Sequence, residues 1–274
     1  MLDVPRRERR GRADGGTMRL HVQPQLCRPA GPRSANPPDE PANGGRGSNR
    51  RTHYRLSLPL GCRMPRPFTS VTSIPAPLMR DDVDTDVIIR VERLFGAVPR
   101  EELGLFAFEA LRCRADGTRD PDFPLNNELY QGAEILLTGD NFGCGSAREG
   151  AVWALAGMGY RTILAPSFAD IFTINCFQNG ILPVTLHRDR IEQFAAFVTS
   201  RPTAAFVTVD LNNQTVTGPD ALTHTFDVPA LRRQALLEGL DDIAMSMKHS
   251  DDIHAFRIED RRLRPWAYPI DVRK

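Results

Sequence analysis

The sequence predicts an α/β fold in which helices pack on a mixed sheet. From residue 130 onward, short apolar runs typical of strands alternate with longer stretches typical of helices, which indicates strands joined by helical crossovers. Near the end of the chain, residues 206–211 and 215–217 flank Asn212-Asn213, a pattern typical of an antiparallel hairpin. Crossovers and a hairpin together favour a mixed sheet over a strictly parallel, dinucleotide-binding fold.

Residues 1–63 lack this alternation and are crowded with Arg, Pro, Gly and Ser. Such a segment buries too little apolar surface to offset the entropy of ordering, so we expect a disordered extension. Two alternatives remain open for it: translation starts at Met64, or the basic extension touches RNA. The folded domain is expected at residues 64–260, followed by a flexible tail at residues 261–274.

The first half of the domain is less regular than the second. We expect a strand at residues 69–76, a polar loop at 81–86 that leads into the apolar residues 87–89, and helices at 90–98 and 101–112. In the second half, strands are expected at residues 135–138, 161–165, 182–186, 206–211, 215–217 and 224–228, and helices at 151–158, 168–177, 191–198, 229–238 and 240–248.

Composition excludes several classes of function. The 35 Lys and Arg residues nearly balance the 34 Asp and Glu residues, so no overall field favours nucleic acid or an anionic membrane surface. No apolar run has the length of a membrane span, so we expect no membrane partner. Five scattered cysteines without C-x-x-C spacing are typical of a reducing, cytoplasmic protein, and they give no iron–sulfur ligand pattern within this chain.

The turn at residues 140–150 is the candidate site, because it joins a predicted strand to a predicted helix. Gly143 and Gly145 allow positive φ angles, which turn successive N–H groups toward one point, and the helix that follows adds the positive end of its dipole. Ser146 supplies a hydroxyl, and Arg148 supplies a planar cation that suits a carboxylate. These features predict a site for a carboxylic acid.

Each feature also has a plain structural explanation. Two glycines before a helix can be no more than a tight turn, and Ser146 can be a helix cap. Arg148 can form a surface pair with its neighbour Glu149, and Cys144 can be a small buried side chain.

Longer motifs decide between these explanations. Besides the turn itself, whose sequence is Asp140-Asn141-Phe142-Gly143-Cys144-Gly145-Ser146-Ala147-Arg148-Glu149-Gly150, they lie at residues 82–89, 122–126, 165–172, 175–183 and 239–243. In this order, from about Phe68 to about Phe256, the chain resembles the small subunits of 3-isopropylmalate dehydratases, the swivelling-domain family of the aconitase superfamily. The resemblance implies a single swivelling domain of the aconitase type.

The resemblance also implies a mechanism. In this superfamily a 2-hydroxy acid loses water, and water returns with the hydroxyl on the neighbouring carbon. A separate large subunit carries a [4Fe–4S] cluster, which acts as a Lewis acid, while the small subunit binds no cofactor or metal and supplies the base, here Ser146. The substrate would be a small diacid held by Arg148, Ala147, Gly145, Arg100 and Asp86.

Several positions depart from the family pattern. Ala147 replaces a second serine, and Gly150 replaces a histidine. In the segment expected to meet the side group of the substrate, Arg90-Val91 replaces Pro-Lys, and acidic residues follow Arg100. Three functions therefore remain open: isomerisation of 2-isopropylmalate to 3-isopropylmalate in leucine biosynthesis, hydration of another small diacid such as methylmalate, citraconate or a substituted maleate, and anion binding without catalysis.

Overall fold

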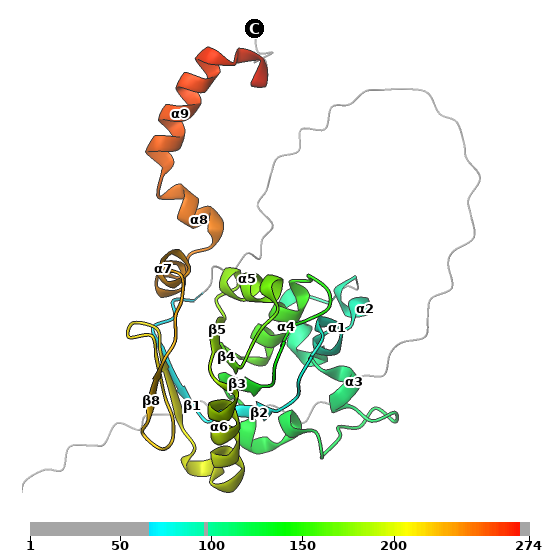
Figure 1. Cartoon of the computed structure of the whole chain (residues 1–274). Helices are drawn as coiled ribbons and strands as arrows, with labels where there is room; N and C mark the ends of the chain where they lie inside the picture. The colour runs from blue at the N-terminus through cyan, green and yellow to red at the C-terminus, as the bar shows by residue number, and fades with distance from the viewer. Residues whose placement is uncertain (1–65, 96–97, 269–274) are drawn as a thin grey trace, which may run out of the picture.

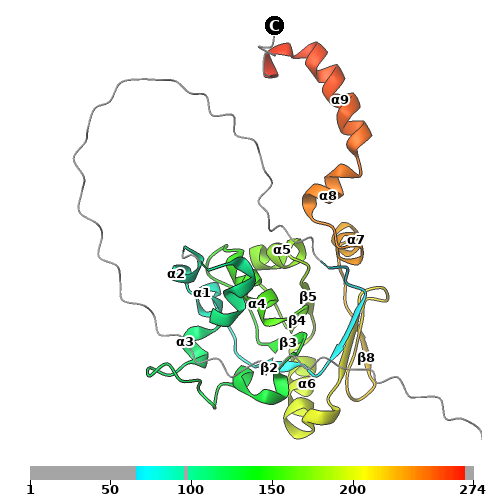
Figure 2. The same cartoon turned by 180° about the vertical axis from the view of Figure 1, so that it is seen from behind.

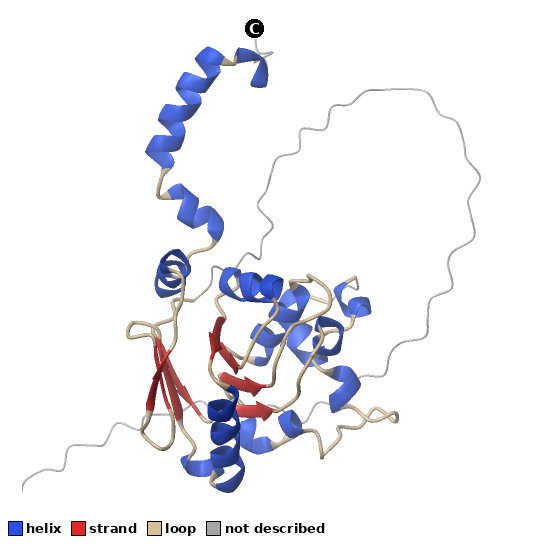
Figure 3. Ribbon diagram, in the orientation of Figure 1, coloured by secondary structure: helices blue, strands red, loops and turns tan. Residues whose placement is uncertain are grey.

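The computed structural model describes residues 66–95 and 98–268 as an α/β protein with two four-stranded sheets (Figures 1 and 3). The parallel sheet has the order β2-β3-β4-β5, with strands β2 Ala76–Leu78, β3 Ile135–Thr138, β4 Thr162–Ala165 and β5 Leu182–Thr185. The antiparallel sheet has the order β1-β6-β7-β8, with strands β1 Ser70–Ser73, β6 Val207–Asp210, β7 Thr215–Thr217 and β8 Thr223–Thr225.

The predicted α/β class is confirmed, but the predicted mixed sheet is divided in two. The strand expected at residues 69–76 breaks, so that β1 pairs with β6 and β2 pairs with β3. Pro75 lies between them and cannot donate a ladder hydrogen bond. Pro77 and Pro183 lie in β2 and β5, the two edge strands of the parallel sheet, where a missing N–H group is tolerated.

The parallel sheet is covered on both faces. Leu136 of β3 points into a core shared with helices α1 Thr85–Ile88, α4 Gly150–Met158 and α5 Asp170–Gln178. Its neighbours Ile135 and Leu137 point to the other face, into a core shared with helix α6 Arg188–Ser200 and the antiparallel sheet. Burial on both faces explains why β3 and β4 are apolar without alternation. The turns at the carboxyl ends of these strands are therefore held by a rigid scaffold.

Between β2 and β3, the structure has several short helices in place of the two longer helices expected at residues 90–98 and 101–112. Helix α1 begins at Thr85, inside the polar loop expected at residues 81–86. After α1 come helix α2 Val91–Leu94, the 3-10 helix η1 Arg100–Phe106, helix α3 Glu109–Arg112 and two short 3-10 turns, η2 Pro124–Asn126 and η3 Glu128–Tyr130. The expected helix at 101–112 breaks at Phe108, whose φ angle is 56°, outside the range of a right-handed helix. A Cβ atom at Gly104 would overlap the backbone of Gly157, so η1 packs closely on α4.

The last three helices lead away from the two sheets (Figures 1 and 2). Helix α7 Ala230–Glu238 buries Ala235 and Leu236, whereas α8 Asp242–Met247 and α9 Ser250–Leu263 bury no residue. The sequence patterns did not predict helix α9. Within residues 66–95 and 98–268, no helix combines the length and apolarity that a membrane crossing requires. The predicted extension at residues 1–63 and the possible start at Met64 lie outside the described residues.

Candidate active site

The turn after β3 is fixed by backbone hydrogen bonds to the segment after β2. Gly143 N donates to Val83 O at 2.8 Å, and Thr85 N donates to Cys144 O at 3.0 Å. These bonds continue the parallel pairing of β2 and β3 beyond the ends of the strands. The turn therefore extends the parallel sheet at the carboxyl ends of its strands, where α/β proteins commonly bind ligands.

The two glycines of the turn are needed for space as well as for conformation. Gly143 has a φ angle of +78°, and a Cβ atom there would overlap the ring of Phe172. Gly145 has a φ angle of +85°, and a Cβ atom there would overlap the carboxylate of Asp84. The predicted tight turn is confirmed, and no other residue type fits either position without strain.

The predicted anion nest is wrong in two respects. The N–H group of Gly143 donates to Val83 O, so it is not available to an anion. Helix α4 begins at Gly150, four positions after Ser146, and its cap residue is Glu149, so Ser146 is not the cap either. Because a helix dipole acts mainly within its first turn, its contribution at Ser146 is small. Helix α4 therefore adds little to the positive potential at Ser146.

Ser146 lies against a buried threonine. Its Oγ is 2.8 Å from Thr85 Oγ1, and Thr85 Oγ1 also donates to Ser146 O at 3.1 Å. Thr85 is only 2% exposed, while Ser146 is half-buried. The sequence predicts only a polar loop at residues 81–86, and Thr85 was not among the predicted site residues. A threonine between two aspartates directly before an apolar run was the signal that could have revealed it.

Arg148 pairs with Asp86 at the start of helix α1. Arg148 Nη1 donates to Asp86 Oδ1, and the two side chains are 37% and 52% exposed. Asp84 caps the helix by accepting a hydrogen bond from Asp86 N at 2.6 Å. The surface pair between Arg148 and Glu149 is wrong, because Arg148 pairs with Asp86 instead. Residues 85–86 thus lie against residues 146–148, and within this group the side chain of Ala147 is exposed.

Arg100 lies in a neighbouring cluster instead. Its guanidinium stacks on the ring of Trp153, 4.4 Å from the centroid, and donates to Asn179 Oδ1. Asn179 Oδ1 also accepts from Trp153 Nε1 at 3.1 Å, and its Nδ2 donates to Glu149 Oε1 at 2.6 Å. Because Glu149 follows Arg148 directly, this cluster adjoins the Arg148–Asp86 pair.

Comparisons with known proteins identify the family. Residues 65–189 match the aconitase C-terminal domain. The chain is 45% identical over 200 residues to the 3-isopropylmalate dehydratase small subunit of Dinoroseobacter shibae, covering 73% of this chain and 98% of that protein. The chain belongs to the family of 3-isopropylmalate dehydratase small subunits.

The chain is also similar to two further proteins. The small subunit of Leptospira interrogans is 45% identical over 207 residues, covering 75% of this chain and all of that protein. The crystal structure of 3-isopropylmalate dehydratase from Methanocaldococcus jannaschii is 25% identical, covers 69% of this chain and 99% of that chain, and superimposes with a TM-score of 0.49. The family resemblance inferred from the motifs is confirmed.

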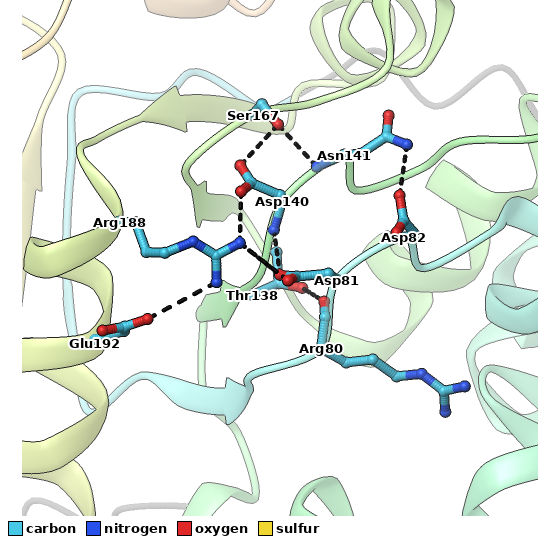
Figure 4. A network of polar contacts seen from close by, with 9 residues as sticks. All are labelled: Arg80, Asp81, Asp82, Thr138, Asp140, Asn141, Ser167, Arg188 and Glu192. Carbon is cyan, nitrogen blue, oxygen red and sulfur yellow. Dashed lines mark hydrogen bonds and ion pairs between the residues drawn. The ribbon is translucent and has the colours of Figure 1, made fainter.

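A second polar network in this small-subunit fold joins the ends of the parallel strands (Figure 4). Arg188 Nη2 donates to both oxygens of Asp81, at 2.9 and 3.0 Å, and to Asp140 Oδ2. Asp140 also accepts from Ser167 Oγ at 3.0 Å, and Glu192 lies 3.7 Å from Arg188 Nη1. The network connects the segments that follow β2, β3 and β4 to the first turn of α6. Sequence reasoning missed it, although Asp140 follows β3 by two positions.

Charge in this network shifts two carboxyl groups toward the ionised form. The guanidinium of Arg188 and the hydroxyl of Ser167 lower the pKa of Asp140. The pKa of Asp81 is lowered first by the backbone N–H of Asp140 and then by Arg188. A cavity of about 300 Å³ opens beside the network, lined by Met79, Asp81, Gly139, Arg188, Glu192 and Ala195. Because the Arg188 guanidinium already faces three carboxylates of this chain, we interpret the network as a structural framework that holds the strand ends together, and not as a binding site.

The described cysteines give no reactive centre. Burial, followed by the charges of Asp84 and Asp82, raises the pKa of the free Cys144 thiol, and burial raises that of the free Cys176 thiol. Cys113 is disulfide-bonded and therefore offers no free thiol. In the described part of the chain, no three His, Cys, Asp or Glu side chains are grouped so that they could hold a metal ion.

Proposed function

We propose that this chain is the small subunit of a hydro-lyase that converts 2-isopropylmalate to 3-isopropylmalate by dehydration and rehydration, in the cytoplasm, as a step of leucine biosynthesis. The observation that carries the proposal is the arrangement of Ser146 and Arg148. One turn presents both side chains, and two consecutive residues of helix α1, Thr85 and Asp86, hold them. Family members with 45% identity carry the corresponding name.

In this proposal Ser146 is the base and Arg148 the carboxylate clamp. Arg148 uses Nη1 on Asp86, and its guanidinium has further N–H donors with which to grip a substrate carboxylate in a bidentate manner. Asp86 fixes the plane of the guanidinium, so the carboxylate and the adjacent C–H bond are aligned before reaction. Ser146 Oγ then takes the proton from that carbon. Gly145 is required beside Ser146 because any side chain there would displace Asp84.

The reaction needs a partner, because no group of side chains among the described residues fits an iron–sulfur cluster. We propose that a large subunit holds a [4Fe–4S] cluster, which when bound supplies a Lewis acid for the departing hydroxyl. The contribution of this chain is to bind the diacid, orient it and move the proton at Ser146 Oγ. We expect the isolated chain to be inactive.

Activity on another small diacid is the second candidate, and one contact favours it. A Cβ atom at Gly150 would overlap the side chain of Leu94, so the space beyond Gly150 is filled from helix α2. Two of the departures from the family pattern, at Gly150 and in the segment 90–102, therefore meet in space. If Arg100 and this segment contact the side group of the substrate, as we propose, their altered neighbours change which side group fits.

The test is reconstitution with the large subunit, followed by anaerobic assay on a panel of diacids. We expect activity on 2-isopropylmalate and a loss of about 10³-fold in kcat for Ser146→Ala, because general-base catalysis is typically of this size. Ser200→Ala is the matched control, since Ser200 is exposed at the end of α6 and bonds only within its helix. Turnover of methylmalate or a maleate in place of 2-isopropylmalate would support the second candidate. Normal activity of Ser146→Ala would refute the site, and failure to bind any large subunit would leave only a non-catalytic anion-binding role.

A further inference from the structure

We propose that Thr85 is a positioning residue that supplies a redirectable proton to Ser146. In the resting enzyme the Thr85 hydroxyl donates to the carbonyl of Ser146, and when Ser146 Oγ becomes anionic the same hydroxyl turns to donate to it. This inference rests on the proposed function and deepens it, because it explains how a serine oxygen in this turn could carry negative charge.

The geometry places both acceptors within reach of one hydroxyl. Thr85 Oγ1 lies 3.1 Å from Ser146 O and 2.8 Å from Ser146 Oγ. The Thr85 backbone is held independently, since its N–H donates to Cys144 O at 3.0 Å and its carbonyl accepts from Ile89 N at 2.9 Å. At 2% exposure the threonine side chain is shielded from water. A rotation about the Cβ–Oγ1 bond is therefore enough to move its proton from one acceptor to the other.

The two hydroxyl protons of Thr85 and Ser146 allow one arrangement of hydrogen bonds in the resting enzyme when Thr85 donates to Ser146 O. A carbonyl oxygen can only accept, and each hydroxyl has a single proton to donate. When Thr85 donates to Ser146 O, the 2.8 Å contact between the hydroxyls is satisfied only if Ser146 Oγ donates to Thr85 Oγ1. The serine proton then points toward helix α1, and the lone pairs of Ser146 Oγ point elsewhere. Ser146 is thus held in one rotamer before substrate arrives.

The reactive arrangement reverses the direction of that bond. After Ser146 Oγ has lost its proton to water, Thr85 donates to the resulting oxyanion, and a hydrogen bond to a charged oxygen is stronger than one to a neutral carbonyl. Ser146 Oγ then accepts the proton of the substrate C–H bond. The electron pair of that bond forms the carbon–carbon double bond as the neighbouring hydroxyl leaves. Ser146 is neutral again, and the Thr85 proton returns to Ser146 O.

The experiment compares Thr85→Val with Thr85→Ser in the reconstituted complex with the large subunit. Valine keeps the shape of threonine and removes the hydroxyl, while serine keeps the hydroxyl. We expect Thr85→Val to lower kcat by about 10- to 100-fold with little change in KM, because one charge-assisted hydrogen bond is lost. Loss of the donor also raises the pKa of the serine base, so the rising limb of the kcat–pH profile should move to higher pH. Thr85→Ser should restore both quantities.

A role limited to holding the turn predicts different results. Thr162→Val is the matched control, because Thr162 is buried and donates to Leu182 O at 2.8 Å, away from Ser146. If Thr85→Val behaves like this control, with lower thermal stability but an unchanged kcat per complex and an unchanged pH profile, the proposal is wrong. Should Thr85→Val fail to fold, Thr85→Ala lacks the hydroxyl without adding bulk and answers the same question.

The outcome also separates this inference from the proposed function. A normal Thr85→Val enzyme together with an inactive Ser146→Ala enzyme overturns the role of Thr85 and leaves the base in place. Normal activity of Ser146→Ala overturns both.

Discussion

Two arginines tie the segment after β2 to the segment after β3, and they differ in how much of their charge the chain uses. Arg188 faces the carboxylates of Asp81, Asp140 and Glu192. Arg148 pairs with Asp86 through a single nitrogen, at a position where both side chains are partly exposed. Arg188 thus faces three carboxylates of its own fold, whereas Arg148 faces one. In the proposed function, Arg188 stabilises the fold and Arg148 binds the substrate.

Substituting each arginine by lysine should separate the two roles. Arg148→Lys keeps the charge but loses the planar fork, so we expect kcat/KM of the reconstituted enzyme to fall about 100-fold while the melting temperature hardly changes. Arg188→Lys should leave kcat/KM within about threefold, because exposed ion pairs contribute little and Lys can keep one of them. The measurement is steady-state kinetics with thermal melts of both variants. Equal losses of kcat/KM would mean that Arg188 belongs to the site as well.

A glycine substitution should test whether the turn beneath Arg148 is a strained, closely packed element. Gly143→Ala must accept a φ angle of +78° and a methyl group that overlaps the Phe172 ring. Gly132→Ala is the matched control, because its φ angle is +77° but no atom lies within 4 Å of its Cβ position. We expect the free energy of unfolding to fall by about 1–2 kcal/mol for Gly132→Ala. For Gly143→Ala, the overlap of the new methyl group with the Phe172 ring should lower the free energy of unfolding by about 1–3 kcal/mol more.

Urea denaturation of the two glycine variants gives the comparison directly. If the free energy of unfolding falls equally in both variants, the positive φ angle alone accounts for the destabilisation, and Phe172 has room to move. A larger loss for Gly143→Ala should be accompanied by lower kcat, because displacement of the turn moves Ser146.

The sequence predicted the elements whose signals are local. Strands β3 and β4 and helices α4 and α5 lie where the apolar runs placed them, because burial on both faces makes such runs long and unambiguous. Helix α9 was not predicted, although its apolar residues recur at helical spacing; none of its residues is buried in the fold. The break at Phe108 was missed because a positive φ angle at a phenylalanine has no sequence signature.

The candidate site divides in the same way. Ser146, Arg148 and the two glycines share one turn, so a short motif contained them. Thr85 is 61 positions from Ser146, and Arg188 is 48 positions from Asp140. Contacts over such distances depend on how the sheet is wound, and the expected single mixed sheet gave no reason to bring those residues together. Local patterns thus predicted the candidate site residues, whereas the residues that hold them in place could be found only from the fold.

The smallest expected effect, a change in stability with pH, should distinguish the framework arginine from the site arginine. Arg188 lowers the pKa of Asp140, and the pKa of Asp81 is lowered first by the backbone N–H of Asp140 and then by Arg188. The stabilisation from these carboxylates is therefore present above the unfolded Asp pKa of about 3.9 and is lost as pH falls through the lower folded values. The melting temperature of Arg188→Met should therefore lie below that of the unsubstituted chain at pH 6, and the difference should shrink as pH falls from about 5 to below 3. For Arg148→Met, whose partly exposed partner is Asp86, we expect a smaller difference at pH 6. A difference for Arg188→Met that stays constant down to pH 3 would show that Arg188 stabilises the edge by packing beside the cavity, and not by its charge.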